Sequence, residues 1–318
     1  MRRGNLWHNA GRRQFPEQSV LSSSDHPLTD FYQALGHQTH SALGVLWIDV
    51  GQFSLTCVPC STVINASQQD LDELLSRSRR LAAVFPTSEP TGIEGGTLWV
   101  RDRAYGPQSL QRQFRQHVRR GEKLCTVRPI DWQTLRTQGL ECNIDTMRRR
   151  GNSRSPIQTQ TGWDRVCDAA AQVAGLEAFG CFRGDRLIAF LIAWIRDSLC
   201  AGLVMHRSKA AEESRGSHLL FHEFTKTIMQ RDTMTGVSLG RVMLPPQHSL
   251  EQFKQHAGFQ VEPVRIAAVL HPLVRPVLAS SLTRGLMRRL RPWGGPRLSV
   301  LDNVAVLDAA AATHLPRR

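Results

Sequence analysis

The sequence has no apolar stretch long enough to cross a membrane. Its longest apolar run, Leu187–Ile195, spans nine residues and stops at Arg196, whereas a transmembrane helix needs about twenty. A run of this length predicts a buried strand instead. The arginine-rich start of the chain has no apolar segment behind it, so we expect neither a secretory signal nor a transmembrane segment.

The chain also lacks an even set of cysteines. Its seven cysteines are scattered, and an odd number argues against a closed disulfide framework and favours a reducing compartment. Cys57 and Cys60 have the spacing of half a zinc site or of a redox pair. No second pair of this kind follows, so we favour strand-end cysteines without a metal, in a cytoplasmic protein.

Acidic residues are the third deficit. The chain has 27 Asp and Glu against 40 Lys and Arg, a net charge of +13. This excess favours an anionic partner, which is a nucleic acid, an acidic membrane surface, a phosphorylated ligand or an acidic polysaccharide, without choosing among them. A length of 318 residues, 41% of them hydrophobic, suffices for two modest domains or one large domain.

The first hundred residues predict a small α/β unit. The segment ALGVLWIDVGQFSLTCVP has the pattern of two strands around a turn at residues 51–52. In SQQDLDELLSRSRRLAAVF, apolar residues recur at helical spacing, and the stripe consists of Leu71, Leu74, Leu75, Ala82 and Phe85. A further strand is expected at TLWVRD.

An arginine-rich helix is predicted next, in SLQRQFRQHVRRGEKLCTVRPI. Ser109 is the expected N-cap, Leu110, Phe114 and Val118 form an apolar stripe, and Gly121 is the expected C-terminal glycine. The other faces carry Arg112, Arg115, Arg119 and Arg120. These arginines form either a solvated face or a site for phosphate or nucleic acid.

From Glu177 onward the pattern predicts three strands, a loop, a helix, a strand, a helix and a strand. The strands are EAFGCF, LIAFLIAWI and LCAGLVMH, the helix is HLLFHEFTKTIMQ, and VSLG follows it. The last helix has Ser249 and Gln252 as a capping box and ends at Gly258 before the strand VEPVRIAAVL. This order predicts an α+β sheet with helices on its faces.

The succession resembles the GNAT (GCN5-related N-acetyltransferase-like) fold, and more closely its FemAB-like and polysaccharide-associated acetyltransferase branch. The resemblance rests on FRQHVRRGEKLCTVRPI, GLEAFGCFRGDRLIAFLIAW, SHLLFHEFTKTIMQ with VSLG, and FKQHAGF. It covers roughly residues 105–272, and it implies a GNAT-like mixed sheet flanked by helices. Residues 1–104 are expected to form a second, degenerate GNAT-like half, and residues 273–318 a basic amphipathic tail.

The resemblance implies acyl transfer, with acetyl-CoA or another acyl-CoA as the donor. The loop that corresponds to the family's phosphate-binding loop is Glu213–His218, and Arg215, Gly216, Ser217 and His218 are the expected donor-binding residues. Ser217 is also the expected cap of the helix that follows. The family's second glycine is missing here, so an ordinary helix start is the open alternative.

For catalysis, His206 at the end of the third strand is the best-placed candidate base, and Glu223 on the following helix is the second. A strand-end histidine without a role is the alternative for His206. Lys254 matches the family's lysine and is expected either to reach a phosphate or acceptor carboxylate or to be a solvated charge. His218 and His222 lie one helical turn apart, but without a third ligand we predict no metal site.

The leading functional hypothesis is an acyltransferase that acts on a sugar or amine acceptor in envelope or exopolysaccharide synthesis. Arg115, Arg119, Arg120 and Lys254 are the residues expected to bind an anion or the acceptor. One alternative is aminoacyl transfer from tRNA, whose phosphates suit the basic charge. Another is an anion-binding protein that kept the fold and lost the chemistry.

The tail carries leucines at four-residue steps among arginines. These leucines are Leu278, Leu282, Leu286 and Leu290. A basic amphipathic helix of this kind lies on an acidic membrane surface, here the inner face of the membrane, or packs its leucines against the domain. We favour packing against the domain.

Overall fold

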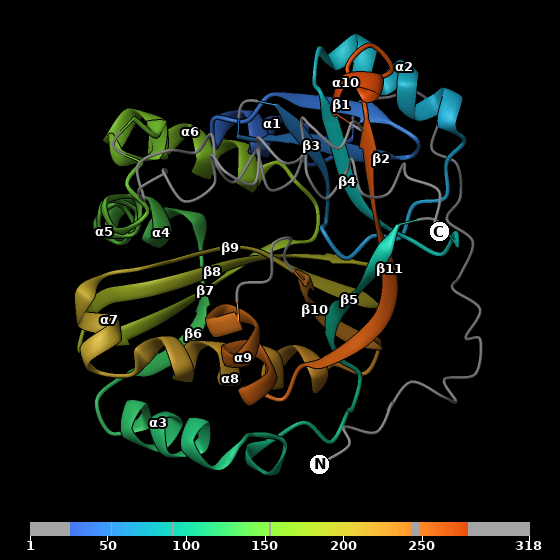
Figure 1. Ribbon diagram of the computed structural model, residues 1–318. Coiled ribbons are helices and arrows are strands. Elements are labelled where there is room, and N and C mark those ends of the chain that lie inside the picture. The colour runs from blue at the N-terminus through green and yellow to red at the C-terminus, as the bar shows by residue number, and fades with distance from the viewer. Residues whose placement is uncertain (1–25, 52, 91, 153, 243–247, 279–318) are drawn as a thin grey trace.

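The computed structural model describes residues 26–51, 53–90, 92–152, 154–242 and 248–278. These residues form one mixed sheet of eleven strands with helices on its faces (Figure 1). The α+β class predicted from the sequence is therefore confirmed.

The first part of the chain contains a short helix, a three-stranded meander, a second helix and two further strands. In order, they are α1 (Thr29–Ala34), β1 (Thr39–Ala42), β2 (Val45–Val50), β3 (Ser54–Val58), α2 (Gln68–Ser78), β4 (Ala82–Thr87) and β5 (Ile93–Val100).

The second part begins with the arginine-rich helix and repeats the meander, with more helices around it. In order, its regular elements are the 3-10 turn Pro107–Ser109, α3 (Arg112–Glu122), β6 (Thr126–Ile130), α4 (Trp132–Gln138), α5 (Leu140–Arg149), the 3-10 turn Pro156–Gln158, α6 (Gln160–Ala171), β7 (Leu176–Arg183), β8 (Arg186–Arg196), β9 (Leu199–Arg207), α7 (Lys209–Glu213), α8 (Gly216–Met229), β10 (Gly236–Arg241), α9 (His248–His256), β11 (Gln260–Leu270) and α10 (Arg275–Leu278).

The strand order is β1-β2-β3-β4-β11-β5-β10-β9-β8-β7-β6. The parallel pairs are β3 with β4 and β9 with β10. In each pair the first strand ends an antiparallel meander, and a helical connection leads from it to the second strand. The same β-β-β-α-β order therefore occurs twice. At the centre of the sheet, strands of the two parts of the chain pair with each other. β5 of the first part pairs with β10 of the second part, and β11 of the second part lies between β4 and β5 of the first part.

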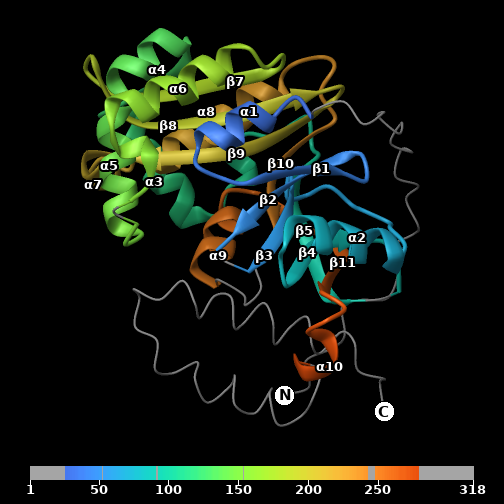
Figure 2. The same ribbon diagram turned by 90° about the horizontal axis from the view of Figure 1, so that it is seen from above.

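The sheet around β8 is buried on both faces. Ile188 belongs to the apolar cluster beneath α8, while Phe190 belongs to the cluster under α6 on the opposite face. Figure 1 shows α4, α5 and α6 on one side of these strands and α7 and α8 on the other, with α3 packed outside α8. The view from above shows α2 on the other part of the sheet (Figure 2). The continuous apolar run was thus correctly predicted as a central strand.

Two predicted helices have different bounds in the structure. α2 ends at Ser78, where Arg79 adopts a left-handed conformation, so Ala82 and Phe85 lie in β4 and not in a helix. Both faces of β4 are buried, so apolar residues occupy consecutive positions along this strand. Two of them therefore also fit the spacing expected of a helix. The capping box predicted at Ser249 is also wrong, since α9 already includes His248.

Helix α3 differs at both ends from its prediction. Its N-cap is Gln111 rather than Ser109, and Gly121 lies inside the helix. A Cβ on Gly121 would lie 3.0 Å from Cβ of Leu219 on α8. The glycine therefore permits close contact between two helices instead of ending one. The predicted tail helix from Leu282 onward lies outside the described residues.

Candidate functional site

A cleft opens where β9 and β10 part. The two strands are paired from Leu199 and Gly236 only as far as Ala201 and Ser238. Both then lose regular register: β9 is bulged at Leu203 against β8, and β10 shifts after Ser238 against β5. Because the strands stop pairing while each continues, the sheet splays, and a cavity of about 610 Å³ lies there.

Six elements line this cleft, namely α5, β8, β9, α8, β10 and α9, and its walls combine apolar with polar and charged side chains. The apolar residues are Leu191, Leu203, Val204, Met205, Phe221, Leu239, Leu250 and Phe253, and the polar or charged residues are Thr146, Arg149, Arg150, Arg207, Ser217, Ser249 and Lys254. An apolar wall with a few charged groups is typical of a site that binds a ligand with a polar end.

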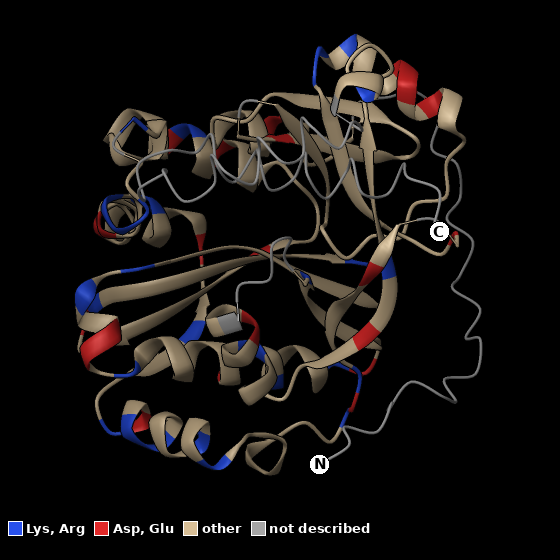
Figure 3. Cartoon of the chain, viewed as in Figure 1, with Lys and Arg blue, Asp and Glu red and all other residues tan. Residues whose placement is uncertain are grey.

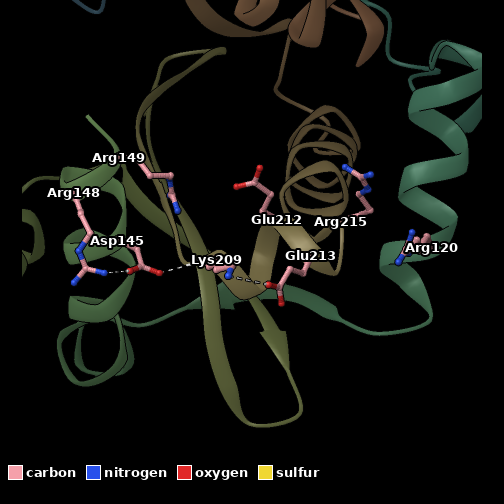
Figure 4. A pocket seen from close by; sticks show the side chains of 8 residues that line it. All are labelled: Arg120, Asp145, Arg148, Arg149, Lys209, Glu212, Glu213 and Arg215. Carbon is pink, nitrogen blue, oxygen red and sulfur yellow. Dashed lines mark hydrogen bonds and ion pairs between the residues drawn. The ribbon is translucent and has the colours of Figure 1, made fainter. Parts of the chain in front are cut away.

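A second cavity, of about 660 Å³, adjoins the start of α8 (Figure 4). We call it the basin. Its lining consists of Arg120, Asp145, Arg148, Arg149, Lys209, Glu212, Glu213 and Arg215. Arg149 lines both the basin and the cleft, so the two cavities adjoin at this residue. Figure 3 shows Lys and Arg on α3 and α5, whereas α7 carries both charges.

Arg207 connects the two cavities. Its backbone N–H donates to the Thr146 hydroxyl (2.9 Å), which donates in turn to the Arg207 carbonyl (3.1 Å), and Arg149 also donates to that carbonyl. The Arg207 guanidinium approaches Ser217 at 3.4 Å and Glu212 at 3.6 Å. Burial lowers the pKa of Arg207, with Arg149 adding to the effect and Glu212 opposing it. A cation is therefore held at the end of β9, beside the first turn of α8.

The start of α8 differs from its prediction. Arg215 is the N-cap, in a left-handed conformation with φ of 63°, and no side chain caps the helix. The expectation that Ser217 caps it is therefore wrong, because Ser217 lies inside the first turn. Gly216 faces the core, where a Cβ would lie 3.0 Å from Sγ of Cys181. This glycine allows α8 to start close to the sheet, and its missing side chain does not face the basin.

His206 lies on the face of the sheet that packs against α5. It is buried, and its Nδ1 is 2.6 Å from Oδ1 of Asn143. Because that oxygen only accepts, Nδ1 carries the proton. Burial, followed by the charges of Arg150 and Arg149, lowers the pKa of His206 to about 3. His206 lines neither cavity, and it ties β9 to α5.

The other predicted residues on α8 face α3. His218 approaches His117 at 3.2 Å and packs on Phe114, while the buried His222 approaches the hydroxyl of Tyr105 at 3.4 Å. Burial lowers the pKa of His218 to about 3 and that of His222 to about 4. Glu223 approaches Lys226 at 3.7 Å and lines neither cavity.

Of the predicted anion-binding residues, two line the cavities. Arg120 lines the basin and Lys254 lines the cleft, whereas Arg115 and Arg119 line neither. Arg115 donates to the carbonyl of Leu110. Lys254 donates to the carbonyl of Leu239, and burial lowers its pKa. It is therefore no solvated surface charge.

The sequence reasoning missed four cations of the basin and its boundary, as well as the carboxylates of the basin. The four cations are Arg148, Arg149, Arg207 and Lys209. A signal existed in the run of three arginines at residues 148–150, but the run gains meaning only from the proximity of α5 to the end of β9. Among the described residues, no group of three or more His, Cys, Asp or Glu is placed to hold a metal.

No protein-family model and no curated protein sequence matches the chain. Solved structures do match. A crystal structure of FemX superposes with a TM-score of 0.50 at 12% identity, over 79% of this chain and 93% of that chain. The C-terminal domain of a protein assigned as a lysylphosphatidylglycerol synthetase from Agrobacterium fabrum superposes with a TM-score of 0.51 at 13% identity, over 80% and 90%. These matches confirm the GNAT-like, FemAB-like fold. No described helix has the length and apolar character needed to span a bilayer.

Proposed function

We propose that the protein is a transferase that moves an acyl group from acyl-CoA to an amine or hydroxyl. The observation that carries this proposal is a cleft with apolar and cationic walls that adjoins, at Arg149, a charged basin with five Lys and Arg side chains at a helix start. A donor with phosphates at one end and an acyl group at the other matches both cavities. The acceptor, a sugar or an amine in envelope or exopolysaccharide synthesis, remains part of the proposal.

In this proposal the donor's phosphates lie in the basin. Arg215 and Arg120 approach them from one side, and Arg149 from the other. The first turn of α8 adds backbone N–H groups that no side chain caps. Charge-assisted hydrogen bonds from arginine to phosphate are stronger than those between neutral groups.

The acyl group then lies in the cleft beside the bulge of β9. A bulge leaves its extra residue outside the ladder, and the extra residue here is Leu203, between the Ile192–Val204 and Ala193–Gly202 pairs. Its backbone N–H is the proposed donor to the carbonyl oxygen as negative charge develops there. The acceptor's nitrogen or oxygen attacks the carbonyl carbon, the C–S bond breaks, and the thiolate of CoA leaves.

The proton of the acceptor needs a recipient. The described residues that line the cleft include no Asp, Glu or His, so neither Glu223 nor His206 takes this role here. Lys254 is the ionisable amine in the cleft, and burial lowers its pKa. We assign to it the orientation of the acceptor or leaving group, with water as the first recipient of the proton.

The test is a calorimetric titration of the purified protein with CoA and acetyl-CoA at moderate salt, which suppresses nonspecific anion binding. We expect saturable binding, weakened about tenfold or more in Arg215→Gln because a charge-assisted bond is lost. Arg183→Gln, at the exposed end of β7, is the matched control and should bind as the parent does. Equal affinity in both variants would remove the basin from the proposal.

Aminoacyl-tRNA is the second candidate donor, because exposed arginines extend beyond the basin. Arg119 on α3 is exposed outside the basin, and Arg148 on α5 is exposed in its lining. A polyanion that follows both helices would bind with an affinity that falls steeply with salt. Binding of tRNA with such a slope, together with failure of CoA to compete, would favour this donor. An anion-binding protein without catalysis is supported if CoA binds and no acyl donor is consumed.

A further inference from the structure

The ion pair between Arg207 and Glu212 stands at the boundary of the two cavities. Arg207 lines the cleft, and Glu212 lines the basin. Glu212 belongs to α7, the short helix that precedes α8 and lengthens the connection from β9. The pair therefore joins a residue of the cleft to a residue of the basin.

The pair is loose and accessible. The nearest nitrogen of Arg207 and oxygen of Glu212 are 3.6 Å apart, longer than the 2.7–2.9 Å typical of a charge-assisted hydrogen bond. The side chains are 36% and 55% exposed. A pair of this kind contributes little to stability, so an incoming anion displaces it at small cost.

The other acidic residues of the basin have different partners. Glu213 approaches Lys209 within α7 itself at 3.8 Å, and Asp145 accepts from the backbone N–H of Lys209 at 2.9 Å. In Figure 4, Glu212 lies in the view between Arg149 and Arg215, whereas Glu213 points toward Lys209. Glu212 is thus the carboxylate that meets the cation at the boundary.

We propose that Glu212 is a specificity-determining residue whose carboxylate competes with the donor's phosphate for Arg207. This inference rests on the proposed function. A ligand binds by taking Arg207 from Glu212, and it must also tolerate the carboxylate that remains nearby. A pyrophosphate carries enough charge to do so, whereas a singly charged phosphodiester gains little over the carboxylate that it replaces.

The experiment measures the affinity of inorganic pyrophosphate by calorimetry for the parent protein, Glu212→Gln and Glu213→Gln. Glutamine keeps the size of the side chain and removes its charge. We expect Glu212→Gln to bind about three- to tenfold more tightly, from loss of the pair that competes for Arg207. Glu213→Gln removes the same charge from the same cavity and should change the affinity less than twofold.

A double variant separates competition from a general change of potential. If Glu212 acts through Arg207, the gain in Glu212→Gln disappears when Arg207→Gln is present in both proteins that are compared. A gain that persists there, or an equal gain in Glu213→Gln, would overturn the inference. Dimethyl phosphate, followed by NMR shift titration, should bind the parent much more weakly than pyrophosphate does, because a single charge gains little over the carboxylate that it replaces.

The outcomes also separate this inference from the proposed function. Tighter pyrophosphate binding in Glu212→Gln without any acyl transfer would retain the inference and overturn the function. Acyl transfer from CoA with unchanged affinity in Glu212→Gln would do the reverse. If pyrophosphate binds neither the parent nor Glu212→Gln, Glu212 has no anion to compete with and the inference fails.

Discussion

At the scale of single residues, side-chain direction decides what each group does. Gly216 and Ser217 are adjacent, yet the missing Cβ of Gly216 faces Cys181 in the core while Ser217 lines the cleft. The same holds on β9, where His206 packs against α5 and the next residue, Arg207, faces the cavities. Successive strand residues point to opposite faces of a sheet. A prediction displaced by one residue therefore names the wrong group.

Gly216→Asp is expected to destabilise the fold. A carboxylate at this position would enter the space of Cys181 and Ile188, whose atoms lie 3.0 and 3.1 Å from an added Cβ. Burial of a carboxylate without a partner and overpacking each cost about 1–3 kcal/mol. Urea unfolding would measure the loss. Gly184→Asp is the control, because an added Cβ there meets nothing within 4 Å and φ is +59°, which Asp tolerates; equal losses would contradict this account.

His206→Gln is expected to flatten the dependence of stability on pH. Burial lowers the pKa of His206 in the folded protein to about 3, from an ordinary value of 6.5. Between these values the unfolded chain binds a proton that the folded protein does not, so stability is full above pH 6.5 and declines as pH falls toward 3. One such histidine contributes up to about 1.4 kcal/mol per pH unit.

Denaturant unfolding at pH 6 and pH 5 would measure this slope. The slope should fall by about 1 kcal/mol per pH unit in His206→Gln, while the other histidines whose pKa burial lowers, among them His26, His218 and His222, contribute to the remainder. His256→Gln, at the end of α9, is the control. An unchanged slope in His206→Gln would show that the imidazole already takes up its proton in the folded protein.

At the scale of elements, α5 determines the position of the basin. The Thr146 hydroxyl bonds to both the N–H and the carbonyl of Arg207, and Arg149 from the next turn bonds to the same carbonyl. The end of β9 is therefore fixed to α5 through the backbone. The guanidinium of Arg207 remains available for Glu212 or a ligand.

Thr146→Val is expected to weaken both folding and anion binding. The substitution keeps the shape of the side chain and removes three hydrogen bonds at a buried position, at a cost of about 1–3 kcal/mol. Pyrophosphate affinity should fall several-fold because Arg207 loses its fixed position. Thr137→Val is the control, since the Thr137 hydroxyl bonds only to carbonyls of its own helix; similar effects of both variants on affinity would remove α5 from the account.

At the scale of the whole molecule, the pairing of β5 and β11 joins the two parts of the chain. β11 is paired from Arg265 to Leu270 with β4, and from Gln260 to Ile266 with β5. The cleft beside β10 thus depends on a neighbouring strand from the first hundred residues. The division at residue 104 remains a prediction, and the shared sheet argues that neither part is stable alone.

Residues 105–278 expressed alone are therefore expected not to fold. Without β4 and β5, strand β11 has no partner and β10 keeps only β9, which leaves long unpaired edges that favour aggregation. The intact chain should unfold in a single transition, with coincident far-UV circular dichroism and tryptophan fluorescence. A fragment with dispersed amide NMR signals and a cooperative melt would contradict this expectation.

From Glu177 onward, the sequence by itself determined the order β-β-β-α-β-α-β, apart from the short helix α7 in the predicted loop, because each element satisfies its apolar pattern locally and Gly184 and Gly258 mark turns between elements. It also determined the basic charge. Only the tertiary structure decided which arginines meet, since Arg120, Arg149, Arg207 and Arg215 come from four elements and no local pattern encodes their convergence. The tertiary structure also decided that His206 and Glu223 lie outside the cavities. It decided as well that β11 lies between β4 and β5, and that β5 pairs with β10. Contacts between distant segments depend on packing and strand register, which a local pattern of residues does not specify.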